Sequence, residues 1–129
     1  KILKKMCNRH NKKYYPKYKK WCDEYFYLPH RKEARGIGGI FFDYKKDNFE
    51  KDFKFVREVG TTFELIFKRI IKKKIKKKWT LRDKEMQYIK RGRYTEFNLL
   101  YDRGTKFGLQ TGGNVEAILM SLPPIAKWK

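Results

Sequence analysis

A run of like charge in the middle of the chain sets the strongest limit on how the sequence can fold. Residues 72–78 read KKKIKKK, six lysines around one isoleucine. Neighbouring ammonium groups repel one another and are costly to remove from water, so this run cannot be packed inside an apolar core. It predicts a frayed helix end or a loop at this point in the chain.

The rest of the chain has enough apolar residues for a folded core in spite of its charge. There are 34 Lys and Arg against 14 Asp and Glu, a formal net charge of +20, yet 40% of the 129 residues are hydrophobic and 17% are aromatic. Disordered chains carry far fewer such residues. This length suits one domain. We expect one partial domain over residues 1–129, partial because the first residue is Lys1 rather than Met.

No segment of the sequence predicts export or membrane insertion. The chain has no long uncharged apolar run, and the lysines at its start are followed by no apolar segment of a signal peptide. We therefore expect a cytoplasmic protein without membrane insertion. The two cysteines, Cys7 and Cys22, lack the spacing of a metal or redox motif and are predicted to be reduced packing residues.

The basic charge leaves a second class of function open, a small RNA-binding module without catalytic activity. Positive charge drives non-specific binding to nucleic acids through counterion release. However, only nine of the basic residues are Arg, and the 25 Lys accompany ten Ile, an enrichment that AT-rich coding would produce. Segment 35–42, RGIGGIFF, also lacks aromatic residues at the two places where RNA-recognition strands stack bases. We expect no specific nucleic-acid partner.

Apolar spacing and capping residues predict five helices. Two lie near the start, over 2–7 and 14–27. A long helix capped by Asp47 or Asn48 carries an apolar stripe as far as Ile71. The others run from Thr80 through Ile89, opened by a capping box with Asp83, and over 114–122, before two prolines.

Extended runs predict the strands of an antiparallel sheet. Segment 36–44 is rich in β-forming residues, with three glycines that let another backbone or a ligand approach closely. Segments 94–102 and 105–111 read as a hairpin joined by Arg103-Gly104. The expected class is α+β, an antiparallel β-sheet flanked by α-helices.

Isolated residues give only weak indications of a site. His30 lies in a predicted turn, but a metal site needs three or four ligands and His10 is the only other histidine. On the predicted strand 94–102, Glu96 and Asn98 share one face. Such polar residues need buried hydrogen bonds, an interface or a ligand, unless that face is solvated.

Several long motifs, taken together, are far more specific. In chain order they are YYPK (14–17), KWCDEYF (20–26), HR (30–31), RGIGGIFFD (35–43), RGRY (91–94), EFNL (96–99), YDRGT (101–105), FGLQTGG (107–113) and ILMSLPP (118–124). This series resembles oxygen-dependent coproporphyrinogen III oxidase of the bacterial type, and it matches the C-terminal portion of that family.

The resemblance implies an enzyme of haem biosynthesis. Such an enzyme oxidatively decarboxylates two propionate groups of coproporphyrinogen III to vinyl groups and gives protoporphyrinogen IX. Molecular oxygen is the co-substrate, no organic cofactor is needed, and a bound divalent metal cation is left open. The implied fold is a large antiparallel sheet flanked by helices, assembled as a homodimer, with residues 94–129 in the dimerisation region.

The resemblance also assigns residues. One family histidine with a metal or substrate role carries over onto His30, and the segment that contacts substrate carries over onto Gly112, Gly113 and Asn114. Most relatives have Arg where this chain has Asn114. The substrate carries four carboxylates, so arginines are the expected partners for forked contacts; the candidates are Arg31, Arg35, Arg93 and Arg103. No catalytic residue is assigned in this chain, because the family's proton donor lies in the portion that it does not match.

Overall fold

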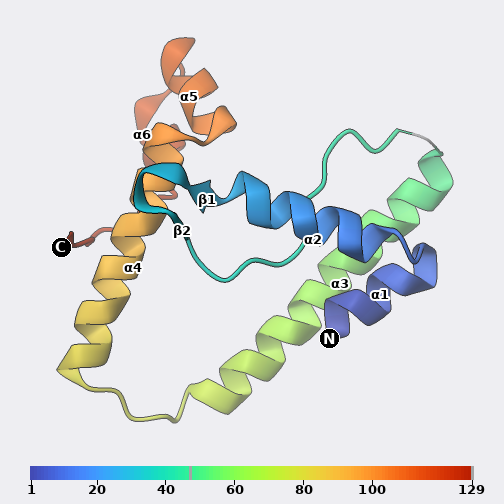
Figure 1. The fold of residues 1–129 in the computed structure, drawn as a ribbon, viewed down its shortest axis with the longest axis horizontal. Helices are drawn as coiled ribbons and strands as arrows, with labels where there is room; N and C mark the ends of the chain where they lie inside the picture. The colour runs from blue at the N-terminus through green and yellow to red at the C-terminus, as the bar shows by residue number, and fades with distance from the viewer. Residues whose placement is uncertain (47, 129) are drawn as a thin grey trace. The chain divides into compact units, whose positions relative to one another are not determined.

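The structure is a computed structural model that describes residues 1–46 and 48–128 (Figure 1). It is mostly helical, with one small antiparallel pair of strands. The elements are α1 (Ile2–His10), α2 (Tyr14–Tyr25), β1 (Tyr27–Leu28), η1 (Pro29–Arg31), β2 (Glu33–Ala34), α3 (Phe49–Lys74), α4 (Leu81–Leu100), α5 (Arg103–Gln110) and α6 (Val115–Leu119). They form two compact units, unit 1 from 1–25 and 38–78 and unit 2 from 26–37 and 79–129.

Unit 1 packs α1 and α2 with α3 around an aromatic core. Its fully buried members are Met6, Cys7, Tyr18 and Phe55. The ring of Phe55 lies at the centre, with centroids 4.9 Å from Tyr14, 5.8 Å from Tyr18 and 5.1 Å from Phe42. Burying a side chain of this size contributes roughly 1.5–3 kcal/mol. Cys7 and Cys22 are buried free thiols, which confirms their assignment as packing residues.

A buried ion pair lies beside that core. The ammonium of Lys45 is 2.7 Å from Asp52, and both side chains are at most 10% exposed. Lys45 also donates to the hydroxyl of Tyr14 at 3.1 Å. Burial alone would lower the pKa of Lys45, but its bonds to Asp52 and Tyr14 outweigh that effect and raise the pKa above its ordinary value.

The long helix begins where capping chemistry predicts. The side chain of Asn48 accepts a hydrogen bond from the amide of Lys51 at 3.0 Å. Asp47, the other predicted cap, lies outside the described residues. The helix ends at Lys74, inside the lysine run 72–78, where cationic side chains interact favourably with the carbonyl end of the helix dipole. The prediction of a helix end at this run is confirmed.

Unit 2 contains the only strands among the described residues. β1 and β2 pair antiparallel, with Tyr27 opposite Ala34 and Leu28 opposite Glu33. The turn between them is closed by Lys32 in the left-handed region, with φ 53°. The capping box of Thr80 and Asp83 that opens α4 is present as predicted.

The predicted strand over 36–44 is wrong, because this segment is irregular where it is described. Its backbone donors bond to α2 instead of to another strand. Phe41 donates its amide to the carbonyl of Tyr18 at 3.1 Å, and Gly39 donates to the sulfur of Cys22 at 3.3 Å. Three glycines also make an extended conformation entropically costly.

The predicted hairpin over 94–102 and 105–111 is wrong as well, because these segments belong to α4 and α5. The capping box nucleates α4, and nothing in its sequence breaks the helix before Leu100. The expected turn at Arg103-Gly104 lies instead in the first turn of α5. Asp102 caps that helix by accepting a hydrogen bond from its third residue at 2.7 Å.

Several helix ends also differ from the prediction. The first helix extends to His10, the second ends at Tyr25 rather than 27, and the last is shorter, Val115–Leu119. The described fold is therefore mostly helical with one small antiparallel pair of strands. It agrees with the predicted α+β class only in containing both helices and antiparallel strands. Within the described residues, no helix combines the length and the apolarity needed to cross a bilayer.

Candidate functional site

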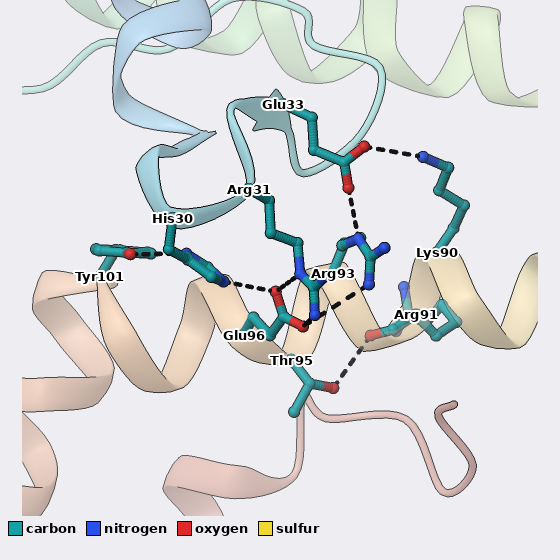
Figure 2. Close-up of polar contacts among 9 residues, drawn as sticks. All are labelled: His30, Arg31, Glu33, Lys90, Arg91, Arg93, Thr95, Glu96 and Tyr101. Carbon is teal, nitrogen blue, oxygen red and sulfur yellow. Dashed lines mark hydrogen bonds and ion pairs between the residues drawn. The ribbon is translucent and has the colours of Figure 1, made fainter. Parts of the chain in front are cut away.

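The candidate site lies in unit 2, where the turn between β1 and β2 faces α4 (Figure 2). Pro29 starts the η1 turn, where its fixed φ suits the first position. This turn directs His30 and Arg31 toward side chains of α4. Both side chains contact Glu96, whose own side chain is only 10% exposed.

Glu96 is held by charged donors. Arg31 donates to both of its carboxylate oxygens, through Nε to Oε2 and through Nη2 to Oε1 at 2.6 Å. Nε2 of His30 lies 2.9 Å from Oε2, and Nη1 of Arg93 lies 3.8 Å from Oε1. The hydrogen bonds from Arg31, against the opposing effect of burial and with help from His30 and Arg93, lower the pKa of Glu96 to about 2. Glu96 is therefore ionised at any physiological pH.

Both ring nitrogens of His30 have partners. Nδ1 lies 2.8 Å from the hydroxyl of Tyr101, and Nε2 faces the carboxylate of Glu96. Because an ionised carboxylate only accepts, Nε2 carries a proton and Nδ1 of the neutral ring accepts from the hydroxyl of Tyr101.

A metal ion does not fit the side chains as they are arranged here. Either nitrogen of His30 could bind a metal only after giving up a contact with Glu96 or Tyr101. No group of three His, Cys, Asp or Glu side chains with metal-binding geometry occurs in the described ranges. The metal role of His30 therefore stays a prediction.

A second carboxylate, Glu33, is bound by the same face of α4. Nε of Arg93 donates to Oε1 of Glu33, and Nζ of Lys90 lies 3.7 Å from Oε2. The hydrogen bond from Arg93 is the main cause of the lowered pKa of Glu33. Arg31 and Arg93, two of the predicted carboxylate ligands, thus each bind a carboxylate of the protein.

Arg35 is held differently, against aromatic rings. Its guanidinium lies 4.2 Å from the ring centroid of Phe26, 5.1 Å from Tyr94 and 5.2 Å from Phe97. Arg91 covers Tyr94 as well, at 4.3 Å. Such cation–π contacts fix a guanidinium without neutralising its charge.

Together these residues form what we call the basic cluster. Its members are Arg31, Arg35, Lys90, Arg91 and Arg93, with the two carboxylates Glu33 and Glu96. Five cations outnumber two anions, so the cluster carries net positive charge even with His30 neutral.

The other predicted residues lie on α5 and in the turn between α5 and α6. Gly112 takes a positive φ of 70°, and the amide of Gly113 donates to the carbonyl of Gly108 at 2.9 Å. Asn114 caps α6 through a bond from Ala117 at 3.2 Å. These glycines thus have a local role in the tight α5–α6 turn, and Arg103 is the first residue of α5.

The structure thus brings together His30, Arg31, Arg35 and Arg93, four residues singled out from the sequence. The role of Glu96 was missed. The sequence predicts for this polar residue a buried hydrogen bond, an interface, a ligand or a solvated face. The structure shows buried hydrogen bonds, which come from Arg31. Glu33 gave no signal, because its partners lie about sixty positions away in the chain.

Comparisons with a family model and with curated proteins both identify the same family. The family described as coproporphyrinogen III oxidase matches residues 1–129. The oxygen-dependent coproporphyrinogen-III oxidase of Rickettsia rickettsii (strain Sheila Smith) is 60% identical over 127 residues. That alignment covers 98% of this chain and 46% of the relative. The enzymes of that name from Rickettsia bellii (strain OSU 85-389) and Rickettsia akari (strain Hartford) match with the same identity and coverage. The chain thus spans less than half the length of these curated relatives.

Proposed function

Since the chain belongs to the coproporphyrinogen III oxidase family, we propose that it acts as the C-terminal portion of an oxygen-dependent coproporphyrinogen-III oxidase. The reaction is the oxidative decarboxylation of two propionate groups of coproporphyrinogen III to vinyl groups, which gives protoporphyrinogen IX in haem biosynthesis. Molecular oxygen is the electron acceptor. His30 is the candidate ligand of a divalent metal cation, and it would bind one only after giving up its contact with Glu96 or Tyr101. No organic cofactor is required.

The net positive charge of the basic cluster is the observation that best supports this proposal. The substrate carries four carboxylates, and a surplus of guanidinium groups beside aromatic rings suits an anionic, flat ligand. Arg35 is our first candidate for a propionate contact, because its guanidinium lies against the rings of Phe26, Tyr94 and Phe97, surroundings that suit a flat ligand. A hydrogen bond of this charged type is worth about 1.5–3 kcal/mol.

Further parts of the proposal follow from the family rather than from the described contacts. We infer that Gly112, Gly113, Asn114 and Arg103 contribute to substrate binding. Residues 94–129 would form the contact of a homodimer, and the small β1–β2 pair would belong beside a larger antiparallel sheet in a complete enzyme. The expected location is the cytoplasm.

A chimeric enzyme tests the proposed function directly. The portion of the Rickettsia rickettsii relative that this chain does not match would be fused to residues 1–129. Aerobic incubation with coproporphyrinogen III, followed by porphyrin fluorescence after oxidation of the product, should show conversion to protoporphyrin. In the same chimera, Arg35→Ala should raise the KM by roughly ten- to a hundredfold, while Arg82→Ala, at an exposed position of α4, should leave it unchanged. A folded chimera without turnover would contradict the proposal.

Asn114→Arg in this chimera should lower the KM for coproporphyrinogen III. Most family members have Arg at this place, and a guanidinium adds a cation where Asn114 offers none. The substitution also removes the cap of α6, which costs about 1 kcal/mol. Asn114→Ala is the matched control, because it loses the cap without adding charge. If both variants gave the same KM, another cation would already fill this role.

A further inference from the structure

In unit 1, the long helix α3 (Figure 1) carries a stripe of exposed apolar side chains. One face of the helix packs against α1 and buries Phe55 and Thr62. The neighbouring face bears two groups of three apolar residues at spacings of four and three, and Gly60 lies in the gap between the groups. These spacings place both groups along one line of the helix. They are Phe49, Phe53, Val56, Phe63, Phe67 and Ile70, each between 49% and 77% exposed.

The phenylalanines of this stripe form flat pairs. The rings of Phe49 and Phe53 stack at an interplanar angle of 13°, and those of Phe63 and Phe67 at 20°. A helix of 26 residues is about 39 Å long. The stripe thus gathers six exposed apolar side chains on one side of the helix, unlike the single scattered apolar residues that need no explanation.

The charge beside the C-terminal half of the stripe is strongly one-sided. Residues 62–78 hold eight basic residues and one acid, Glu64, which pairs with Lys68. At 100° per residue, Arg57 and Lys68 lie beside one edge of the stripe. The lysine run then extends the charge beyond the end of α3.

The apolar stripe and the positive charge together indicate which kind of partner would bind α3. A second copy of α3 would match the stripe but would bring the same charge, and therefore repulsion. RNA would match the lysines but would leave the phenylalanines in water. An anionic bilayer surface accepts both, with apolar side chains at the acyl-chain boundary and lysines among the headgroups.

We propose that α3 and the lysine run bind peripherally to an anionic phospholipid bilayer through the Phe49–Ile70 stripe. The helix lies in the plane of the interface, in keeping with the finding that no helix of the described chain can cross a bilayer. Long lysine side chains reach outward to the phosphates while the rings sit below them.

Flotation with lipid vesicles tests the charge dependence. The full 129-residue chain should float with vesicles containing 30 mol% phosphatidylglycerol in phosphatidylcholine, and at least tenfold less with pure phosphatidylcholine. Substituting Lys72→Gln, Lys73→Gln and Lys74→Gln should weaken binding to the anionic vesicles by roughly a hundredfold. A matched control changes Lys12→Gln, Lys13→Gln and Lys17→Gln, which removes equal charge from other exposed positions and should have a much smaller effect.

A second pair of variants tests the stripe. Phe63→Gln with Phe67→Gln should reduce binding at least tenfold. Phe107→Gln with Met120→Gln, at exposed apolar positions of unit 2, should not. Because both pairs are exposed, circular dichroism should show unchanged helix content.

Four results would overturn the proposal. They are equal binding to both kinds of vesicle, indifference to the phenylalanine pair, displacement from anionic vesicles by stoichiometric poly(U) RNA, and a protein occupant of the stripe. The last would appear as a dimer, or as capture of the co-expressed remaining portion of the Rickettsia rickettsii relative, that protects Phe63 and Phe67 and abolishes flotation.

Discussion

The 129-residue chain incubated by itself with coproporphyrinogen III in air is expected to form no protoporphyrinogen IX. The chain aligns with 46% of the length of its relatives, and the family resemblance assigns no catalytic residue within it. A positioned proton-transfer group typically contributes 10²–10⁴ in rate, and fixing substrate in a closed site contributes as much again or more. We therefore expect activity at least about 10⁴-fold below that of the chimera.

The comparison needs equal protein and equal assay conditions. Porphyrin fluorescence after chemical oxidation of the product measures both reactions, and the chimera carrying the same 129 residues is the positive control. Adding a divalent cation to the chain alone should not restore turnover, because both nitrogens of His30 are already engaged. Turnover by the purified chain would show that the proton-transfer chemistry is carried within these residues, and it would overthrow this prediction.

Glu96→Gln is expected to cause the largest loss of stability of any single substitution in the basic cluster. A carboxyl whose pKa falls from 4.5 to about 2 on folding contributes about 3 kcal/mol at neutral pH. The amide of Gln keeps the shape but cannot balance Arg31 and Arg93. Urea unfolding, with hydrogen exchange of the α4 amides to localise the change to unit 2, measures the loss. Glu85→Gln is the control, because Glu85 is 52% exposed and its pair with Lys127 should contribute less than about 1 kcal/mol.

The same carboxylate predicts a dependence on pH. The pKa of Glu96 is lower in the folded than in the unfolded chain, so its stabilisation is fully present above pH 4.5 and is lost as the pH falls toward about 2. The difference in unfolding free energy between the natural chain and Glu96→Gln should therefore shrink steadily over that interval. A difference that stays constant down to pH 2 would show that the contribution of Glu96 is not electrostatic.

Local capping chemistry could be predicted from the sequence, and strand pairing could not. The capping box of Thr80 and Asp83 and the cap at Asn48 depend on residues three positions apart, so a short window contains the whole signal. Polar and apolar residues alternate from Glu96 to Leu99, within the run from Tyr94 to Tyr101, which favours a strand. The same run suits a helix once an upstream nucleus exists, and nothing within the run itself distinguishes the two.

The candidate site could be predicted in part for a similar reason. The family resemblance implies a substrate with four carboxylates, so Arg31, Arg35 and Arg93 were predicted as its ligands. The structure places all three on one side of α4. Their partners Glu33 and Glu96 could not be predicted, because those pairs join the β1–β2 turn to α4 across some sixty residues. The family resemblance assigns Gly112 and Gly113 to substrate binding, which stays a prediction. The structure adds a local reason for glycine at both positions, a positive φ at Gly112 and a close backbone contact at Gly113.

The two units are interleaved along the chain, and this has a consequence for folding during synthesis on the ribosome. Residues 26–37 belong to unit 2, but their partners in α4 are translated only after all of unit 1. Because translation adds about 5–20 residues per second, several seconds pass between the synthesis of His30 and Arg31 and that of Glu96. During that interval the β1–β2 turn has no packing partner from its own unit. Nascent chains are thus accessible to proteases and chaperones at this turn, and slower translation through the lysine run would lengthen that interval.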